Sequence, residues 1–162
     1  MRRKITLQEL EELYLDLVNN RMVNLNSSDP FLAGPKKSPQ IVQDTDMLIK
    51  YRGIWSKREH KTFSKGTCHS SSVKNSSLTL LFQGTAIEFW GAKGPARGRA
   101  EVILDGVKID EIDLYSKQFQ PKQLLGNYKV PWGSHFIRIK VLREKNPRSL
   151  GFRVDLDHFK IF

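Results

Sequence analysis

The sequence offers few side chains in arrangements that could catalyse a reaction. It contains no Gly-x-Ser-x-Gly elbow, no Gly-x-x-x-x-Gly-Lys phosphate loop and no His-Glu-x-x-His pair. Cys68 and His69 are adjacent, but neighbouring residues of a strand point to opposite faces, so they would not form a thiolate–imidazole dyad. Cys68 is interpreted as an inert strand residue. The sequence therefore predicts no catalytic residue, and a small hydrolase stays an alternative that needs a constellation visible only in the fold.

Carboxylates offer one weak possibility for a metal site. Asp155 and Asp157 are two residues apart and would share a face of a strand. Two carboxylates could contribute to a calcium site, but calcium takes six to eight oxygen ligands, so a hydrogen-bonded or exposed pair is favoured. The one cysteine excludes an internal disulfide and a Cys-cluster zinc site. No cofactor is predicted.

The net charge of +10 lies entirely in the later part of the chain. Residues 1–45 carry six Lys/Arg and six Asp/Glu, so residues 46–162 hold the whole excess, and residues 50–74 carry seven bases against Glu59. Such a charge would attract phosphate groups of nucleic acid, teichoic acid or an anionic surface. No nucleic-acid motif accompanies it, so a solvated surface with lysines on strand edges is favoured and nucleic-acid binding ranks last.

The pattern of the first 23 residues predicts a helical segment for anchoring or oligomerisation. Thr6 and Glu9 form a capping box, and apolar residues at three- and four-residue spacing follow it: Leu10, Leu13, Tyr14 and Leu17. We expect a helix over residues 6–20. An isolated helix of this length is marginal in water, so its stripe must be buried. Docking on its own domain and association with itself or a larger particle both remain open.

Residues 24–43 read as a linker and residues 44–162 as a β-domain. The linker is rich in Pro, Gly, Ser and Asn and lacks periodicity. After it come short segments that alternate between apolar and polar residues, separated by Gly, Pro, Asn and Ser clusters. These predicted strands are residues 47–51, 78–82, 86–90, 100–104, 107–114, 136–141 and 152–159, and Asp105-Gly106 is a hairpin signal. We expect an all-β, antiparallel jelly-roll sandwich of eight or nine strands, closed by pairing of the first and last strands.

The length of 162 residues allows one domain with an appendage. No apolar run is long enough for a membrane span. The basic start resembles a signal peptide, but Glu9, Glu11, Glu12 and Asp16 interrupt its apolar region, so we expect synthesis in the cytoplasm without one.

Aromatic residues on or beside the predicted strands could stack on the apolar faces of sugars. They are Tyr51, Trp55, Trp90, Tyr115, Tyr128 and Trp132. Large rings also dominate hydrophobic cores, so for any single one of them a core position is favoured.

The second segment resembles a family of bacterial galactose-binding-like β-sandwich domains, which are often appended to glycosidases and surface proteins. The resemblance covers about residues 44–162 and rests mainly on an apolar strand that runs into a Lys-Gly-Pro-x-Arg-Gly loop. The matching stretches, in order, are residues 44–46, 51–55, 66–70, 84–98, 100–106, 112–115, 133–135, 145–149 and 154–159. The chain departs from the pattern at Ala92 and Ala96, which makes the loop more basic, and at Cys68.

This resemblance implies a non-catalytic module for cell-surface carbohydrate or glycopolymer. Its candidate ligand-binding residues fall into three pairs: Lys93 and Arg97 as donors or loop-setting residues, Trp90 and Tyr115 as platforms, and His69 and Asn146 as polar contacts. The alternative for Lys93 and Arg97 is turn geometry, with Arg97 paired to a local carboxylate.

The layout of a helix, a spacer and a sandwich favours a module displayed by a helical anchor on a larger assembly such as a bacteriophage virion. Several copies would gain avidity, so we expect a homo-oligomer or larger assembly through residues 6–20, acting at a virion or cell surface. The alternative is a structural virion, decoration or scaffold protein that binds protein and no sugar.

Overall fold

The alternating segments form ten β-strands in a computed structural model, which describes residues 38–162. The predicted helix over residues 6–20 lies outside these residues. One short 3-10 helix, η1 (Ser64–Gly66), accompanies the strands, and none of the described helical segments could cross a membrane. The strands are β1 (Gln40–Gln43), β2 (Ile49–Arg52), β3 (Ser56–Glu59), β4 (Thr67–Ser71), β5 (Ser77–Lys93), β6 (Arg99–Leu104), β7 (Val107–Asp113), β8 (Gln120–Val141), β9 (Val154–Leu156) and β10 (His158–Ile161).

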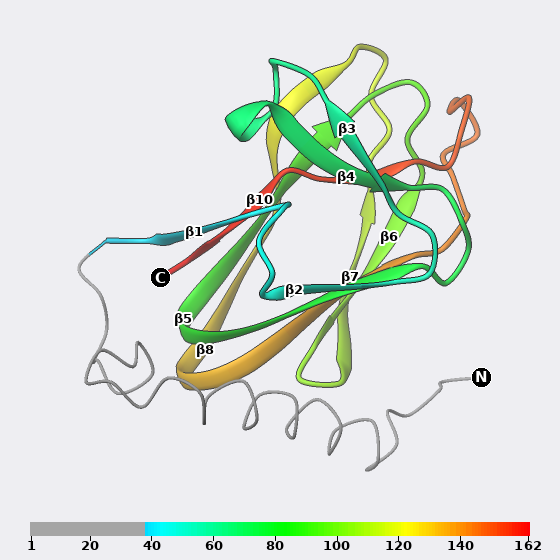
Figure 1. The fold of residues 1–162 in the computed structure, drawn as a ribbon. Coiled ribbons are helices and arrows are strands. Elements are labelled where there is room, and N and C mark those ends of the chain that lie inside the picture. Colours follow the sequence, from blue (N-terminus) through cyan, green and yellow to red (C-terminus); the bar gives the residue numbers. More distant parts are fainter. Residues whose placement is uncertain (1–37) are drawn as a thin grey trace. The chain divides into compact units, whose positions relative to one another are not determined.

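The strands build two antiparallel sheets, which confirms the all-β prediction (Figure 1). The large sheet has the order β1-β10-β5-β8-β6-β7, with β2 paired to the first part of β5. The small sheet has the order β3-β4-β9. The described strands number ten, against the eight or nine expected, because short strands such as β3 carry no apolar alternation.

The first and last strands pair, as expected, but the domain begins earlier than the predicted boundary at residue 44. Gln40–Gln43, which were expected in the linker, form β1 and pair in register with His158–Ile161 of β10. Val42 of β1 is fully buried in the core. Residues 40–43 are therefore part of the sandwich.

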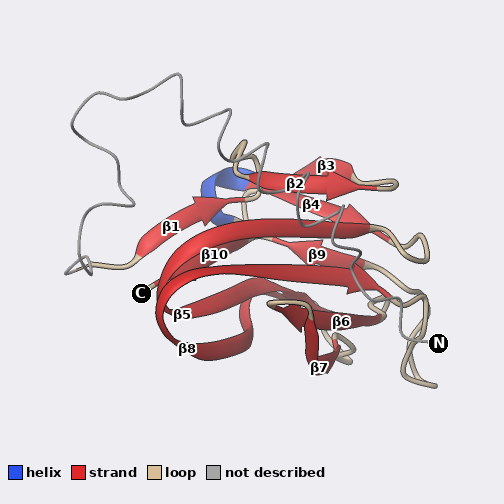
Figure 2. Ribbon diagram, turned by 90° about the horizontal axis from the view of Figure 1, so that it is seen from below, coloured by secondary structure: helices blue, strands red, loops and turns tan. Residues whose placement is uncertain are grey.

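Strands β5 and β8 are long and strongly curved (Figure 2). Their pairing contains three register shifts, near Gly84, Phe89 and Gly91, and shifts of this kind bend a strand. A Cβ atom at Gly91 would collide with the carbonyl oxygen of Asp155 in β9, so only glycine lets the two backbones pass. Two segments that look separate in the sequence, 78–82 and 86–90, are thus one bent strand.

The chain crosses from the small sheet to the large sheet at Asp157. Val154 and Leu156 point from β9 into the core, and Phe159 and Ile161 point into it from β10. The three-residue step from Leu156 to Phe159 breaks the alternation, so the predicted strand over 152–159 is two short strands in different sheets. This switch gives Asp155 and Asp157 different surroundings.

The Asp105-Gly106 hairpin is confirmed. It joins β6 to β7, and both of its central residues have positive φ, 49° at Asp105 and 82° at Gly106. These angles are those of a type I′ turn, whose twist matches that of the strands it connects.

Candidate functional site

The loop of residues 94–98, which carries the Lys-Gly-Pro-x-Arg-Gly motif, is fixed by backbone hydrogen bonds to three other segments. Gly94 donates to the carbonyl oxygen of Leu114 at 3.0 Å, Leu150 donates to Pro95 at 2.7 Å and Arg153 donates to Ala96 at 3.2 Å. These bonds join the loop to the end of β7, to the loop after β8 and to the start of β9. The loop is therefore rigidly placed beside the small sheet.

Two polar side chains hold the segment that follows β8 against this loop and against the end of β7. The buried hydroxyl of Ser149 lies 2.6 Å from the carbonyl oxygen of Arg97, to which it donates. Asn146 donates to Asp113 Oδ2 at 2.9 Å and accepts from the backbone N–H of Arg148 at 3.1 Å. Asn146, predicted as a polar contact, thus has both ends of its amide engaged in holding loops together.

Arg97 is buried, 8% exposed, and pairs with a local carboxylate, as the alternative interpretation of this residue expected. Its Nε donates to Asp155 Oδ2 at 2.8 Å, and Asp155 is 1% exposed. The second carboxylate oxygen, Oδ1, is buried without a hydrogen-bond partner among the described residues. Burial raises the pKa of Asp155 even though the positive charge of Arg97 opposes the change. Arg97 and Asp155 form the floor of the candidate site.

The outer face of the small sheet, which we define by Arg58, Ser70, Arg153 and Asp155, continues from this floor. Ser70 of β4 lies opposite Asp155 of β9, and Arg58 of β3 donates from Nε to Ser70 Oγ at 2.8 Å. Arg153 lies two residues before Asp155 and forms an isolated β-bridge with Arg97. Burial lowers the pKa of Arg153, and the like charges of Arg58 and Arg97 act in the same direction while Asp155 opposes them. Three guanidinium groups therefore gather around one carboxylate.

Phe119 places an aromatic ring at the edge of this face. Its side chain is 43% exposed, the guanidinium carbon of Arg97 lies 5.0 Å from its ring centroid, and the ring meets the buried Phe63 edge-on at 6.2 Å. The ring is thus supported from below and open above. Its isolation in the polar stretch of residues 116–123 is the signal that could have identified it.

Lys93 and Tyr115 lie at the base of the same loop. Lys93 is the last residue of β5, and Tyr115 forms a β-bridge with Gly94. Both are half-buried. The structure therefore brings four of the predicted residues together around one loop: Lys93, Arg97, Tyr115 and Asn146.

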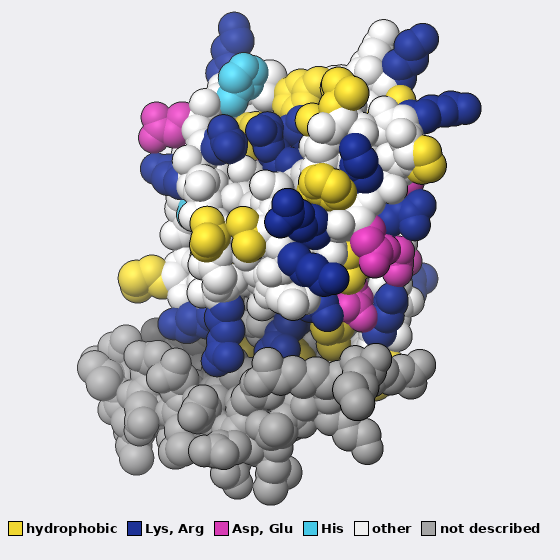
Figure 3. Space-filling view, turned by 90° about the vertical axis from the view of Figure 1, so that its right-hand side faces the viewer, with side chains coloured by type: hydrophobic (Ala, Val, Ile, Leu, Met, Phe, Trp, Pro, Cys, Tyr) yellow, Lys and Arg dark blue, Asp and Glu magenta, His cyan; other side chains and the backbone are white. Residues whose placement is uncertain are grey.

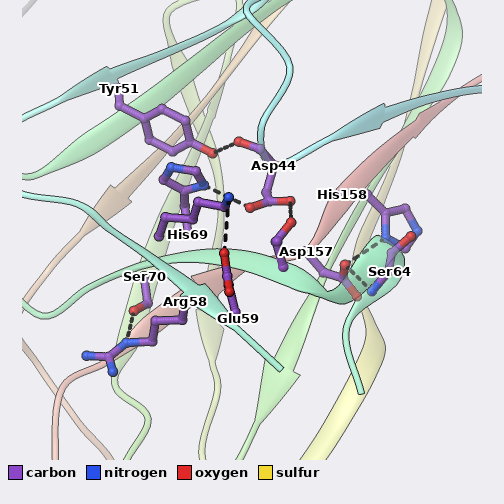
Figure 4. Close-up of polar contacts among 11 residues, drawn as sticks. Asp44, Tyr51, Arg58, Glu59, Ser64, His69, Ser70, Asp157 and His158 are labelled. Carbon is purple, nitrogen blue, oxygen red and sulfur yellow. Dashed lines mark hydrogen bonds and ion pairs between the residues drawn. The ribbon is translucent and has the colours of Figure 1, made fainter. Parts of the chain in front are cut away.

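His69 faces the other side of β4, toward the interior (Figure 4). Its Nδ1 donates to Asp44 Oδ2 at 2.8 Å, and its ring stacks on Tyr51 with centroids 4.5 Å apart. Asp44 is fully buried and accepts a second hydrogen bond from Thr67 Oγ1 at 2.7 Å, while Tyr51 donates to the Asp44 carbonyl oxygen at 2.7 Å. We call Asp44, Tyr51, Thr67 and His69 the inner network. It fastens the chain before β2 to β4.

Trp90 also lies apart from the loop site, on the face of the large sheet opposite to its core neighbour Phe89. Its ring stacks on His158 of β10 at 5.5 Å, Lys160 Nζ lies 4.4 Å from the ring centroid, and its Nε1 donates to Glu88 at 2.8 Å. Because these three side chains already contact the Trp90 ring, the exposed ring of Phe119 is better placed to stack on a sugar.

The described residues contain no group of three or more His, Cys, Asp or Glu side chains arranged for a metal ion. Asp155 is engaged by Arg97, and Asp157 accepts from the backbone N–H of Ser64 at 2.9 Å, so the two candidate ligands serve different partners. Cys68 is buried in β4, and burial raises the pKa of its thiol to about 12. A thiol in this state is a poor nucleophile.

Two curated proteins of Flavonifractor plautii resemble the chain in sequence. One is named A type blood N-acetyl-alpha-D-galactosamine deacetylase and is 29% identical over 117 residues, 72% of this chain. The other is named A type blood alpha-D-galactosamine galactosaminidase and is 28% identical over 105 residues, 65% of this chain. The chain spans 15% and 10% of their respective lengths. No protein-family model matches the sequence.

Solved structures with the same fold belong to carbohydrate-active proteins. A Paenibacillus xanthan lyase matches with a TM-score of 0.60 at 17% identity, over 80% of this chain and 14% of its own. A family two carbohydrate esterase from Cellvibrio japonicus (TM-score 0.54, 18% identity) covers 76% of this chain and 33% of its own. A Podospora anserina GH26-CBM35 mannanase (0.54, 12%) covers 77% and 27%. The chain therefore has the galactose-binding-like β-sandwich fold of carbohydrate-binding modules, as its sequence motifs implied.

Proposed function

We propose that residues 38–162 form a non-catalytic carbohydrate-binding module whose site combines Phe119, the 94–98 loop and the outer face of the small sheet. The observation that carries the proposal is the exposed ring of Phe119, held over the Arg97 guanidinium, which pairs with Asp155 of the small sheet. A flat ring can pack on the apolar face of a pyranose while arginine donors reach its oxygen atoms. Recognition sites commonly combine one apolar surface with a few fixed polar groups in this way.

The fold and the relatives support this proposal. The matching regions are small parts of much longer proteins named as enzymes that act on glycans, and one solved structure with the fold carries a carbohydrate-binding module in its name. The described residues place no nucleophile beside a base, because Cys68 and His69 face opposite sides of β4. A binding role is therefore favoured over catalysis.

A panel of immobilised glycans probed with the full chain tests the proposal. Replacing Phe119 by Ala removes the platform, and we expect at least about a tenfold loss of affinity for any glycan that the wild-type chain binds. Phe162→Ala is the matched control, since Phe162 is exposed to a similar degree, 41%, and lies directly after β10 in the large sheet, away from the 94–98 loop. Equal losses in the two variants, or no binding to any glycan, would contradict the assignment.

We further propose that residues 6–20 attach the module to itself or to a larger assembly such as a virion, which would place it at a virion or cell surface. The leucine stripe supports this part. Light scattering of the full chain against a chain that starts at residue 38 tests it. A cut at residue 44 would remove β1 and its pairing with β10, so the longer version is the proper comparison. If both chains are monomers, the proposal of a self-associating anchor fails. Attachment of residues 6–20 to a different protein of a larger assembly would then have to be tested with that protein present.

A further inference from the structure

We infer that the ligand of this site is an acidic glycan, whose carboxylate or sulfate group is held between Arg58 and Arg153 on the outer face of the small sheet. The inference rests on the proposed function and adds the class of sugar to it. Its basis is an excess of guanidinium groups over carboxylates at one place in the fold.

Strand register places the charged groups in a row. Arg58 on β3 is hydrogen-bonded to Ser70 on β4, Ser70 lies opposite Asp155 on β9, and Asp155 is paired with Arg97 of the loop. Directly opposed side chains on one face of a sheet have Cβ atoms about 5 Å apart, and diagonal ones about 7–8 Å. Arg153 is on the same face as Asp155, two residues earlier in the chain. The row is thus about the width of one or two sugar residues.

The charges in this row do not balance. Asp155 is the single carboxylate there, and Arg97 occupies one of its oxygens. Among residues 38–162, the Arg153 side chain has no hydrogen bond or ion pair, and Arg58 has its Ser70 contact alone. Two guanidinium groups therefore present unused N–H donors on the outer face of the small sheet, and they are close enough for the charge of Arg58 to add to burial in lowering the pKa of Arg153, with Asp155 as the one carboxylate that opposes this effect.

An oxyanion is the group that best satisfies this arrangement. Guanidinium groups present donors in a planar fork that matches the two oxygens of a carboxylate, and such charge-assisted bonds are stronger than bonds to neutral hydroxyls. Partial burial of Arg153 strengthens an ionic contact there, because less water competes for it. Lys and Arg side chains are also spread widely over one side of the molecule, while Asp and Glu lie toward its edges, which would draw a polyanion to the surface (Figure 3).

Affinity measurements with matched polymers test the inference on the full 162-residue chain. Polygalacturonate is compared with its methyl-esterified form, which has the same backbone without the charge, and chondroitin 4-sulfate is compared with unsulfated chondroitin. We expect at least about tenfold tighter binding of polygalacturonate than of its ester. A larger gain from the sulfate than from the uronate would identify sulfate as the group recognised.

Charge-removing variants locate the effect. Arg58→Gln and Arg153→Gln should each lower affinity for the acidic polymer about tenfold and lower affinity for the neutral polymer by a clearly smaller factor, because a bond to a neutral hydroxyl is weaker than a charge-assisted one. Arg52→Gln removes an equal charge from the exposed last residue of β2, in the large sheet, and should change affinity less than twofold. Melting temperatures of the three variants should agree, because the side chains of Arg58 and Arg153 support little of the fold.

The outcomes separate the two proposals. Equal binding of neutral and acidic polymers would overturn the acidic preference and leave the carbohydrate module standing. Binding of neither polymer by the wild-type chain would overturn both. Binding of single-stranded DNA as tight as that of polygalacturonate, with the same loss in Arg58→Gln, would assign the site to polyanions in general and reject a glycan site.

Discussion

The two faces of strand β4 carry polar side chains of similar kinds but differ in how those side chains are satisfied. On the inner face, Asp44 is fully buried and its carboxylate accepts from Thr67 and His69 at 2.7 and 2.8 Å. On the outer face, Arg97 and Asp155 are paired at the floor, but Arg58 and Arg153 keep donors without partners among the described residues. Matched polar groups in the interior fix a fold, whereas unmatched ones at a surface are available to a ligand.

This comparison predicts that the floor of the outer face contributes most to stability. Arg97→Ala leaves the Asp155 carboxylate buried without its cation, and we expect the free energy of unfolding at pH 7 to fall by about 3–5 kcal/mol. Chemical denaturation of the variant measures the loss. The double variant Arg97→Met with Asp155→Leu removes both charges and should recover much of it. A loss under about 1 kcal/mol in the single variant would show that the pair is not part of the folded framework.

The inner network should come next. Asp44→Asn keeps the size of the side chain but cannot accept from both Thr67 and His69 with charged oxygens, so we expect a loss of about 2 kcal/mol in unfolding free energy. Glycan affinity below the melting transition should not change, because the network faces away from the site. Glu59→Gln, an exposed carboxylate 3.5 Å from Lys57, is the control and should change stability by less than about 0.5 kcal/mol. If the folded Asp44→Asn protein lost glycan binding, the inner face would also contribute to binding, and the proposed difference between the two faces would be wrong.

The smallest effect is a pH dependence. The pKa of Asp155 is raised in the folded state by burial, so the folded chain holds this proton more tightly than the unfolded chain. The resulting stability is fully present below the unfolded pKa of the carboxyl group and is lost as pH rises through the folded pKa. Unfolding free energies of the wild-type chain minus those of Asp155→Asn should therefore decrease from pH 3 upward and level off. A difference that increases with pH would show that Arg97 outweighs burial.

Much of the fold could be predicted from local sequence patterns. Alternating apolar residues located the strands around residues 78–90, 100–114 and 136–141, and Asp105-Gly106 located a hairpin whose turn needs positive φ. Strand β3 was not predicted, because all four of its residues are exposed and none is apolar. The break at Asp157 was not predicted, because a chain that passes from one sheet to another has the same alternating sequence pattern as a single strand.

Local motifs also gave part of the loop region on which the candidate site is built. The loop motif and the motifs that follow it gave Lys93, Arg97, Tyr115 and Asn146 as candidate ligand-binding residues; they lie in or near residues 94–98, and their role in binding stays a prediction. Arg58, Arg153 and Phe119 come from segments without such motifs, and they meet the loop only because β3, β4 and β9 lie side by side. His69 and Trp90 were placed in the site by their chemistry, whereas the register of β4 and β5 turns them to other faces.

The sequence by itself determined the class of fold, the hairpin and the loop, because these depend on the local spacing of apolar, glycine and proline residues. Tertiary structure decided which charged side chains pair with other groups of the protein and which keep donors that a ligand can bind. Asp155 and Asp157 stand two residues apart, yet one meets Arg97 across 58 positions of sequence and the other meets the backbone of Ser64 across 93. Pairings over such distances depend on strand register and sheet packing, which no local pattern encodes.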